Sequence, residues 1–156
     1  MFREMRRHKQ QLTREQCEKI LRTAPRGVLA VLGDEGYPYA VPLDFVYRDG
    51  KLYFHCAQVG HKMDALAACD KASFCVLDEG RLEEGDWWYH FNSVIAFGRV
   101  RRLEDEQEIL DALRDLGRKY FPPTYDMEAD IARSLARVAV LELTIEHMTG
   151  KHVREK

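Results

Sequence analysis

A glycine, a histidine and a lysine, Gly60-His61-Lys62, stand where an alternating apolar pattern gives way to a helical one. The residues that follow, 63–70, read MDALAACD and predict a helix that begins at this triplet. The first N–H groups of a helix have no internal partners and carry a partial positive charge, to which Lys62 adds a full one. We therefore expect an anion such as a phosphate to bind here.

Both side chains of the triplet also have plainer roles. Lys62 could be a solvated lysine at the start of a helix. His61 could be a helix cap or surface histidine, a second phosphate donor, or the proton donor to a substrate, because an imidazole titrates near neutral pH. The sequence leaves these alternatives open for both residues.

The strand pattern before the triplet predicts a β-hairpin. Two runs of alternating apolar residues flank Asp49-Gly50, a pair that tolerates the positive φ angles of a type I′ turn. If Arg48 faces Lys51, three further pairs share one face, and their apolar composition makes it the core face. These pairs are Tyr47 with Leu52, Phe45 with Phe54, and Leu43 with Cys56.

The opposite face of this hairpin sets a carboxylate opposite an imidazole, beside two small residues. It comprises Pro42, Asp44, Val46, Tyr53, His55 and Ala57. A flat ligand could approach there, because Pro42 lacks an N–H group and fits only the edge or a bulge of a sheet. The plainer alternative is that His55 and Asp44 pair across the two strands.

A metal site finds little support in the sequence. His55, Cys56, His61 and Asp64 are all ligand types. However, His55 and Cys56 are neighbours in a strand and point to opposite faces, so one ion cannot bind both without distortion. We therefore expect no metal, and no Ser/His/Asp set or pair of carboxylates of the glycosidase type stands out.

The elements that must position these residues are mostly strands joined by hairpins. Helices are predicted at 13–24, where Thr13 and Gln16 form a capping box, from about 62, at 104–120 and at 126–136. Strands are predicted at 27–33, 37–48, 51–57, 72–78, 87–102 with a bend or bulge at Gly98, and 138–148, followed by a polar end at 147–151. About six strands of this kind predict a mainly β fold with peripheral helices, an antiparallel closed or split β-barrel.

Composition narrows the class of protein. A chain of 156 residues predicts one domain over 1–156, and a formal net charge of −2 gives no electrostatic reason to invoke nucleic acid. Four cysteines without CxxC spacing, no signal peptide and no long apolar run predict a cytoplasmic protein with no membrane segment. We expect the basic run at 3–9 to be solvated; the alternative is an arm that binds nucleic acid or phosphate.

Six stretches carry a family likeness over nearly the full chain. They are FREMRR at 2–7, GVLAVLGDEGYPYAVPL at 27–43, LYFHCAQVGHKMDAL at 52–66, SFCVLD at 73–78, SVIAFGRVR at 93–101 and IEHMTGK at 145–151. Together they resemble the FMN-binding split-barrel superfamily that includes pyridoxamine 5′-phosphate oxidase. More narrowly, they resemble its 5-nitroimidazole resistance (Nim) group. The combination of YPYAVPL with YFHC and GHK makes the likeness specific.

The resemblance implies a homodimer of split barrels with two FMN sites at the interface. The implied cofactor residues are Gly60, His61 and Lys62 at the phosphate, Val41, Pro42 and Leu43 along the isoalloxazine, and His55, Cys56 and Ala57 on the neighbouring strand. Trp88 could pack on the flavin or on the partner, and His147 could reach a flavin across the dimer; a structural role is the alternative for both. One hairpin face cannot bury a flat ring, so residues 87–91 and 147–151 are the candidates for a second wall.

The function implied by the resemblance is an FMN-dependent oxidoreductase. It would pass electrons from a reductant to a small flat acceptor such as a nitroaromatic, with the cofactor supplying the chemistry. The alternative is a non-catalytic protein of the same fold that stores FMN or holds haem, for which His61 or His147 could ligate iron.

Overall fold

The computed structural model describes residues 1–154. Within them the strands are β1 Gly27–Leu32, β2 Pro38–Leu43, β3 Val46–Arg48, β4 Lys51–Ala57, β5 Lys71–Leu77, β6 Arg81–Leu82, β7 Tyr89–Arg102 and β8 Val138–Val153. The α-helices are α1 Arg14–Thr23, α2 His61–Ala68, α3 Glu106–Tyr120 and α4 Met127–Ser134, and short 3-10 turns occupy η1 His8–Gln10, η2 Asp34–Gly36 and η3 Leu135–Arg137. No helix among the described residues is long and apolar enough to cross a membrane.

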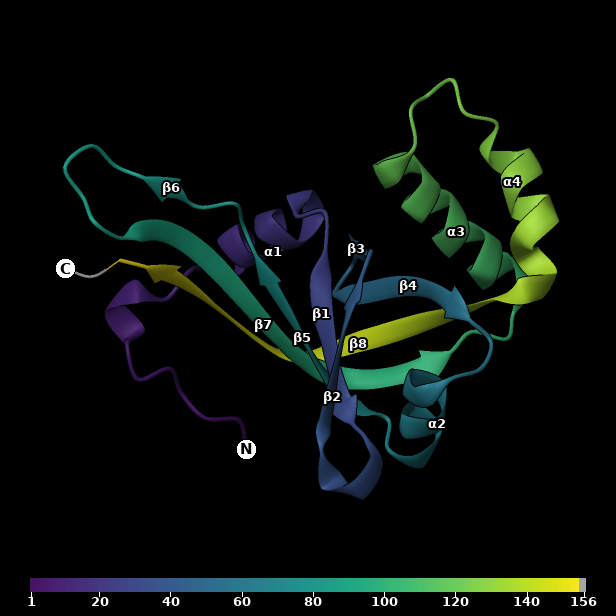
Figure 1. Ribbon diagram of the computed structural model, residues 1–156, viewed down its shortest axis with the longest axis horizontal. Coiled ribbons are helices and arrows are strands. Elements are labelled where there is room, and N and C mark those ends of the chain that lie inside the picture. Colours follow the sequence, from purple (N-terminus) through teal and green to yellow (C-terminus); the bar gives the residue numbers. More distant parts are fainter. Residues whose placement is uncertain (155–156) are drawn as a thin grey trace.

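All strand pairs are antiparallel, and the order across the sheet is β2-β1-β5-β7-β8-β4-β3, with β6 paired to β7. The long strands β7 and β8 cross the molecule and join its two halves, as Figure 1 shows. The edge strands β2 and β3 do not pair with each other within residues 1–154, so the barrel is open along that seam. This arrangement confirms the predicted mainly β, antiparallel split barrel with peripheral helices.

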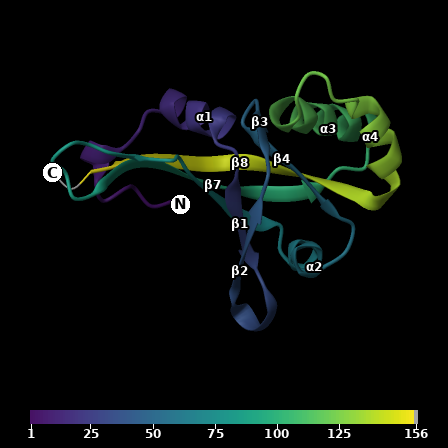
Figure 2. The same cartoon turned by 45° about the horizontal axis from the view of Figure 1, so that its top comes forward.

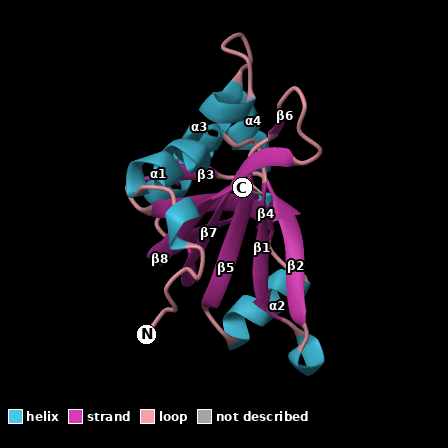
Figure 3. Ribbon diagram, turned by 90° about the vertical axis from the view of Figure 1, so that its left-hand side faces the viewer, coloured by secondary structure: helices cyan, strands magenta, loops and turns pink. Residues whose placement is uncertain are grey.

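The helices divide the interior into two cores. The main core lies inside the curled sheet beneath α1, and it includes Leu29, Phe54, Phe74 and Leu143. A second core lies on the outer side of β4 and the first half of β8, where α3 and α4 cover Tyr53, Leu103 and Val140. Figures 2 and 3 show α3 and α4 on one side of the sheet and α2 at the opposite end. Apolar residues on both sides of β8 are therefore buried.

A turn, a helix cap and a bulge that were predicted from a few neighbouring residues each are present in the structure. Asp49 and Gly50 have φ angles of 50° and 78°, and Arg48 pairs with Lys51 across a two-residue turn, as a type I′ hairpin requires. Thr13 and Gln16 form the capping box at the start of α1. The predicted bulge is present at Gly98, where the pairing between β7 and β8 shifts by one residue. A Cβ atom at Gly98 would collide with the carbonyl oxygen of Thr144, so only glycine allows this approach.

The prediction of one continuous strand at 37–48 is wrong. The chain leaves the sheet between β2 and β3, because two groups of α3 hold the backbone there: the Phe45 N–H donates to the Tyr120 Oη at 2.9 Å, and the Lys119 Nζ donates to the Phe45 carbonyl at 2.8 Å. The strand β2 consequently pairs with β1, and β4 pairs with β8 as well as β3.

Three contacts considered in the sequence analysis are absent because of this break between β2 and β3. Beyond the Val46–Tyr53 pair, the hairpin register does not continue, so the pairs Phe45 with Phe54 and Leu43 with Cys56 are absent from the ladder. The two phenylalanines instead pack on Phe74, with ring centroids 4.8 and 5.0 Å away. Asp44 pairs with Arg26 at 2.7 Å, and His55 lies opposite Val140, so the alternative in which Asp44 and His55 pair across the strands is also wrong.

The C-terminal strand is longer than its sequence pattern indicates. Residues 147–151, predicted as a polar end, continue β8 and pair with β7 as far as Val153. Polar side chains are tolerated there because this part of β8 has solvent or the N-terminal residues on its outer side. With β3 separate and the short β6 added, the described part of the chain has eight strands where about six were predicted.

Candidate functional site

The edge strand β2 supplies one side of the candidate site. Val41 and Leu43 turn inward and pack against the main core, whereas Pro42 faces outward and is exposed. Pro42 lies opposite Val28 of β1, and no strand among residues 1–154 pairs with its other side, which confirms its predicted place at a sheet edge. The outer edge of β2 leaves backbone groups unpaired by any strand, so a ligand can bind along it.

The helix α2 supplies the anion-binding element. It begins at His61 after Gly60, whose φ of 125° favours glycine, and no side chain within residues 1–154 caps it. The Gly60 carbonyl accepts from the N–H groups of Met63 and Asp64 at 2.8 and 3.1 Å, which closes the first turn. The N–H groups that precede this turn and the helix dipole are therefore available to an anion.

The side chain of His61 joins α2 to the hairpin that carries β2. Its ring packs on Tyr39 with centroids 4.1 Å apart, and its Nε2 lies 3.4 Å from the N of Asp34 and 3.6 Å from the Asp34 Oδ2. This contact brings the helix start next to the strand that holds Val41, Pro42 and Leu43. Two of the predicted groups of cofactor residues thus meet at one place in the fold.

Two cations lie near the end of β4. Burial raises the pKa of the Cys56 thiol, and the positive charges of Lys62 and Arg102 offset part of that rise. Cys56 also contacts Met63 of α2, with 3.7 Å between the sulfur atoms. The Cys56 thiol therefore lies within range of the charges of both Lys62 and Arg102.

Arg102 is a candidate site residue that the sequence analysis does not single out. It ends a run in which Arg99 bonds Asp70 and Glu146, and Arg101 bonds Glu142 and Glu108. Arg102 itself forms no ion pair within the described residues. The sequence shows only that the strand end is rich in arginine. The structure is needed to see that Arg102, unlike Arg99 and Arg101, has no acidic partner within residues 1–154.

The remaining predicted cofactor residues lie elsewhere on the chain. His55 and Ala57 are exposed on the outer side of β4, and this strand is not a neighbour of β2 in the sheet, contrary to the expectation of one continuous ligand face. Trp88 precedes β7 at the far end of the molecule, and its buried Nε1 has no partner within residues 1–154. His147 lies on the outer side of β8. Within a single chain, Trp88 and His147 are thus separate from α2.

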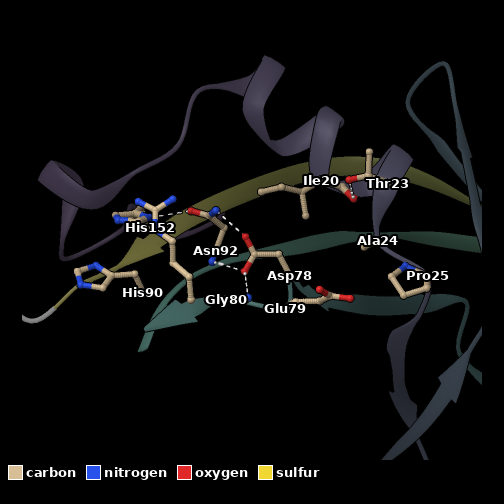
Figure 4. Close-up of a pocket in the computed structure, with 11 residues that line it drawn as sticks. Ile20, Thr23, Ala24, Pro25, Asp78, Glu79, Gly80, His90, Asn92 and His152 are labelled. Atoms are coloured by element: carbon tan, nitrogen blue, oxygen red, sulfur yellow. Dashed lines mark hydrogen bonds between the residues drawn. The ribbon is translucent and has the colours of Figure 1, made fainter. Parts of the chain in front are cut away.

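A polar groove at that far end is built differently. It has a volume of about 390 Å³ and is lined by residues of α1, the segment after β5, and the ends of β7 and β8 (Figure 4). Asp78 accepts from the backbone and side-chain N–H groups of Asn92 at 2.8 and 2.6 Å, and Asn92 Oδ1 lies 2.9 Å from His152 Nδ1. Its lining groups thus bond one another, and no residue predicted to bind the cofactor lines it.

Comparisons with known proteins agree with this fold. The family model described as pyridoxamine 5′-phosphate oxidase matches residues 13–152. A candidate 5-nitroimidazole antibiotic resistance protein from Bacteroides thetaiotaomicron VPI-5482 has 25% identity and a TM-score of 0.77, over 91% of this chain and 86% of that one. A search of curated proteins finds no significant match.

Two further solved structures share the fold. A FAD-binding protein from Mesorhizobium loti has 24% identity and a TM-score of 0.69, over 92% of this chain and 97% of that one. The FAD and heme binding protein from Mycobacterium smegmatis has 23% identity and a TM-score of 0.72, over 94% of this chain and 74% of that one. At these identities the likeness shows the fold alone.

Proposed function

We propose that this chain, which belongs to the pyridoxamine 5′-phosphate oxidase family, is a flavoprotein that binds FMN and passes electrons to small flat acceptors such as nitroaromatics. The observation that carries the proposal is the uncapped start of α2 with Lys62 in its first turn. A helix N-terminus with a cation in its first turn suits the terminal phosphate of FMN, and the charge of Arg102, which also acts on the Cys56 thiol, adds to the positive potential of this end. The relative named for 5-nitroimidazole resistance supports the choice of acceptor.

The residues fit a flavin in three ways. The start of α2 and the two cations offer hydrogen bonds and positive charge to the phosphate. The exposed edge of β2 at Val41, Pro42 and Leu43 offers backbone groups to the edge of a flat ring, since no strand pairs there. FMN when bound supplies the electron transfer, and N–H groups at the ring edge favour the reduced form because they stabilise its negative charge.

His61 has a positioning role in this proposal. Its contact with Tyr39 fixes α2 against the hairpin of β2, so the phosphate end and the ring end of the ligand are held at a set separation. The His61 side chain is 37% exposed, so a substrate can approach it, and a proton donor is one of the three roles that the sequence leaves open for this residue.

A second copy of the chain is the proposed partner. The outer side of β1, β5 and β7 carries a group of exposed apolar residues, bordered by polar ones such as Lys71 and Arg99. Its exposed members include Val28, Leu32, Leu77, Ile95 and Phe97, of which Leu32 and Leu77 are 54% and 53% exposed. Such a face buries itself well against its own copy, which gives an isologous homodimer. We propose that the flavin lies where β2 meets this interface.

Binding without catalysis is the alternative function. It is supported by the relative named as a FAD and heme binding protein, whose fold this chain shares. A haem protein would need an axial ligand, for which the partly exposed His147 is a candidate. The uncapped helix start favours a phosphate over a porphyrin, so FMN remains the first choice.

One reconstitution experiment tests both functions. Purified protein is titrated with FMN, FAD and haemin, and absorbance spectra are recorded; the proposal expects a flavin spectrum and tighter binding of FMN than of FAD. The FMN complex is then reduced with NADH, NADPH or dithionite and mixed with a 5-nitroimidazole. Reoxidation coupled to loss of the nitro compound supports the enzyme. A reduced flavin that does not react with it supports storage, and a Soret band without flavin binding contradicts the proposal.

A further inference from the structure

The polar groove of Figure 4 continues toward η1 into a larger part, which shares Asp78, Asn92 and His152 with it. This larger part has a volume of about 590 Å³ and lies between α1, the short strand β6 and the ends of β7 and β8. Its volume is in the range of sites that bind small molecules. We call it the α1 groove.

The α1 groove opens on the inner side of the sheet. Asn92 and His152 pair across β7 and β8, on the side of β7 that also holds the buried Val94. The next pair along, Ser93 and Lys151, points to the outer side, where the dimer face is proposed. No residue of β2 or α2 lines the groove. It is therefore separate from the proposed flavin site, and it stays open when two copies pack by their outer sides.

The lining of the α1 groove is rich in positive charge, which is carried by Lys9, Lys19, Arg81 and Arg154. Arg81 pairs with the exposed Glu83 at 2.9 Å, whereas the two lysines and Arg154 form no ion pair within residues 1–154. A phosphate monoester carries nearly two negative charges at neutral pH and accepts several charged hydrogen bonds. Such a group suits this set of cations.

The acids at the groove leave this positive charge in excess. Asp78 lines the α1 groove, and its carboxylate accepts from the Gly80 N–H at 3.2 Å and from the backbone and side-chain N–H groups of Asn92 at 2.8 and 2.6 Å. Glu79 lines only the adjoining part shown in Figure 4. The groups of the α1 groove that remain without a partner among the described residues are thus mainly donors.

A buried glutamine is the exception among these donors. Gln10 lines the groove and is 9% exposed, and its Nε2 donates to the Arg154 carbonyl oxygen at 2.7 Å. Its Oε1 is buried and has no donor within residues 1–154. Buried amide oxygens nearly always accept a hydrogen bond, so this atom indicates a missing group with an N–H or O–H.

We propose that the α1 groove binds a small organic phosphate that also carries a hydrogen-bond donor, of the class of the nucleoside monophosphates. The phosphate pairs with the cations of the lining, and a donor on the base or the sugar serves the Gln10 Oε1. The apolar side chains of Leu12 and Ile20, which also line the groove, pack against the base. This site goes beyond the proposed function and does not depend on flavin binding.

The first test compares ligands on protein that has been saturated with FMN, so that the start of α2 is occupied. AMP, GMP, CMP and UMP are titrated by calorimetry at low salt, beside adenosine and inorganic phosphate. A nucleotide should bind about tenfold more tightly than either fragment, because the nucleoside lacks the charged hydrogen bonds and inorganic phosphate lacks the base. No binding of any nucleotide at millimolar concentration, or equal binding of a fragment, would overturn the proposal.

The second test locates the bound nucleotide. Lys19→Ala should weaken its binding about tenfold at low salt, and the loss should shrink as salt is added. Arg22→Ala is the matched control, because Arg22 lies on the same helix, pairs with Glu18 and does not line the groove. In the wild type, the side-chain NH₂ signals of Gln10 and Asn92 should shift on binding in NMR spectra. Equal affinity in the two variants, or signals that do not shift, would overturn the proposal.

Failure of the proposed function has a separate signature. Wild-type protein that binds no flavin would refute that function, and the nucleotide titrations are then made without FMN on Lys19→Ala and Lys62→Ala. A nucleotide in the α1 groove loses more affinity in Lys19→Ala than in Lys62→Ala. The reverse order would place the phosphate at the start of α2 and overturn the proposal.

Discussion

Glu142 is a buried acid whose partners decide its contribution to stability. It is 3% exposed, and its carboxylate accepts from Arg101 Nε at 2.8 Å and from Lys51 Nζ at 3.1 Å. Burial by itself would raise the pKa of Glu142, but the hydrogen bonds from Arg101 and Lys51 lower it overall. The charge is thus stable only while its cations are present.

Arg101→Met should therefore lower the free energy of unfolding by about 3 kcal/mol, because it leaves a buried carboxylate short of a partner. Arg118→Met is the matched control: Arg118 pairs with Asp115 but is 67% exposed, so its loss should cost less than about 1 kcal/mol. Urea denaturation at pH 7 measures both. Equal effects in the two variants would contradict the buried-pair explanation.

The same carboxylate predicts a pH dependence. The pKa of Glu142 in the folded protein lies below its unfolded value of 4.5, so its stabilising contribution is present above pH 4.5 and is lost as the pH falls through the folded pKa. Glu142→Gln should accordingly flatten the fall of the unfolding free energy between pH 5 and pH 3. Identical pH profiles for this variant and the wild type would refute this assignment.

Lys62 is the residue on which the phosphate assignment depends. Lys62→Ala should weaken FMN binding about tenfold at low salt, the usual effect of removing one charged hydrogen bond. The difference should shrink as salt is added, because a partly exposed charge pair is screened over about 8 to 10 Å. Titrations of FMN at 20 and 500 mM NaCl measure it, with Lys19→Ala on α1 as control. A loss that is the same at both salt concentrations would show that Lys62 does not act through its charge.

At the scale of elements, the end of α3 decides where β2 stops. The Lys119 Nζ lies 3.9 Å from the centre of the Phe45 ring and donates to the Phe45 carbonyl, and Tyr120 donates to the same carbonyl at 2.9 Å. Burial lowers the pKa of Lys119 to about 8, while Asp44 acts in the opposite direction. This helix end thus holds the break that frees the β2 edge for a ligand.

From the lowered pKa of Lys119 we also expect a rise in stability at alkaline pH. Its folded pKa of about 8 lies below the unfolded value of 10.5, so between these values the unfolded chain binds more protons and the free energy of unfolding rises with pH. Lys119→Met should lack this rise. Denaturation curves of the wild type and of Lys119→Met are recorded at pH 7.5, 9 and 10.5. The difference between the two proteins isolates the effect of Lys119, because all other groups titrate in both. A constant difference across this range would contradict the lowered pKa.

At the scale of the whole molecule, we expect a homodimer because of the exposed apolar residues on the outer side of the sheet. Ile95 lies near the centre of that face, between Cys75 and Thr149, and is 39% exposed. Ile95→Asp should give a monomer and lower FMN affinity together, because the interface and the flavin site are proposed to be one structure.

Leu82→Asp is the matched control for this prediction. Leu82 is also exposed, but it lies on β6 outside the sheet's outer side, so the variant should remain dimeric. Sedimentation velocity with a parallel FMN titration measures both properties. A wild-type monomer that binds FMN tightly would contradict the dimer and would require one chain to supply both walls.

The sequence by itself determined what short-range physics controls. The Asp49-Gly50 turn, the Thr13 cap and the bulge at Gly98 each depend on the conformational limits of a few residues, and the structure has all three. The start of α2 at Gly60-His61-Lys62 follows the same rule. The antiparallel split barrel could also be predicted, since repeated hairpins exclude a parallel sheet and the family likeness selects the barrel.

Only the tertiary structure decided which strands become neighbours. The apolar alternation continues through Asp44 and Phe45, so nothing local marks the break between β2 and β3; contacts with Arg26, Lys119 and Tyr120, far away in sequence, create it. The lack of an ion pair to Arg102 within residues 1–154 and the stack of Phe2 on His147 depend on long-range packing in the same way. The apolar pattern along the chain indicates which side of a strand is buried, but the residues that pack against that side depend on the tertiary structure.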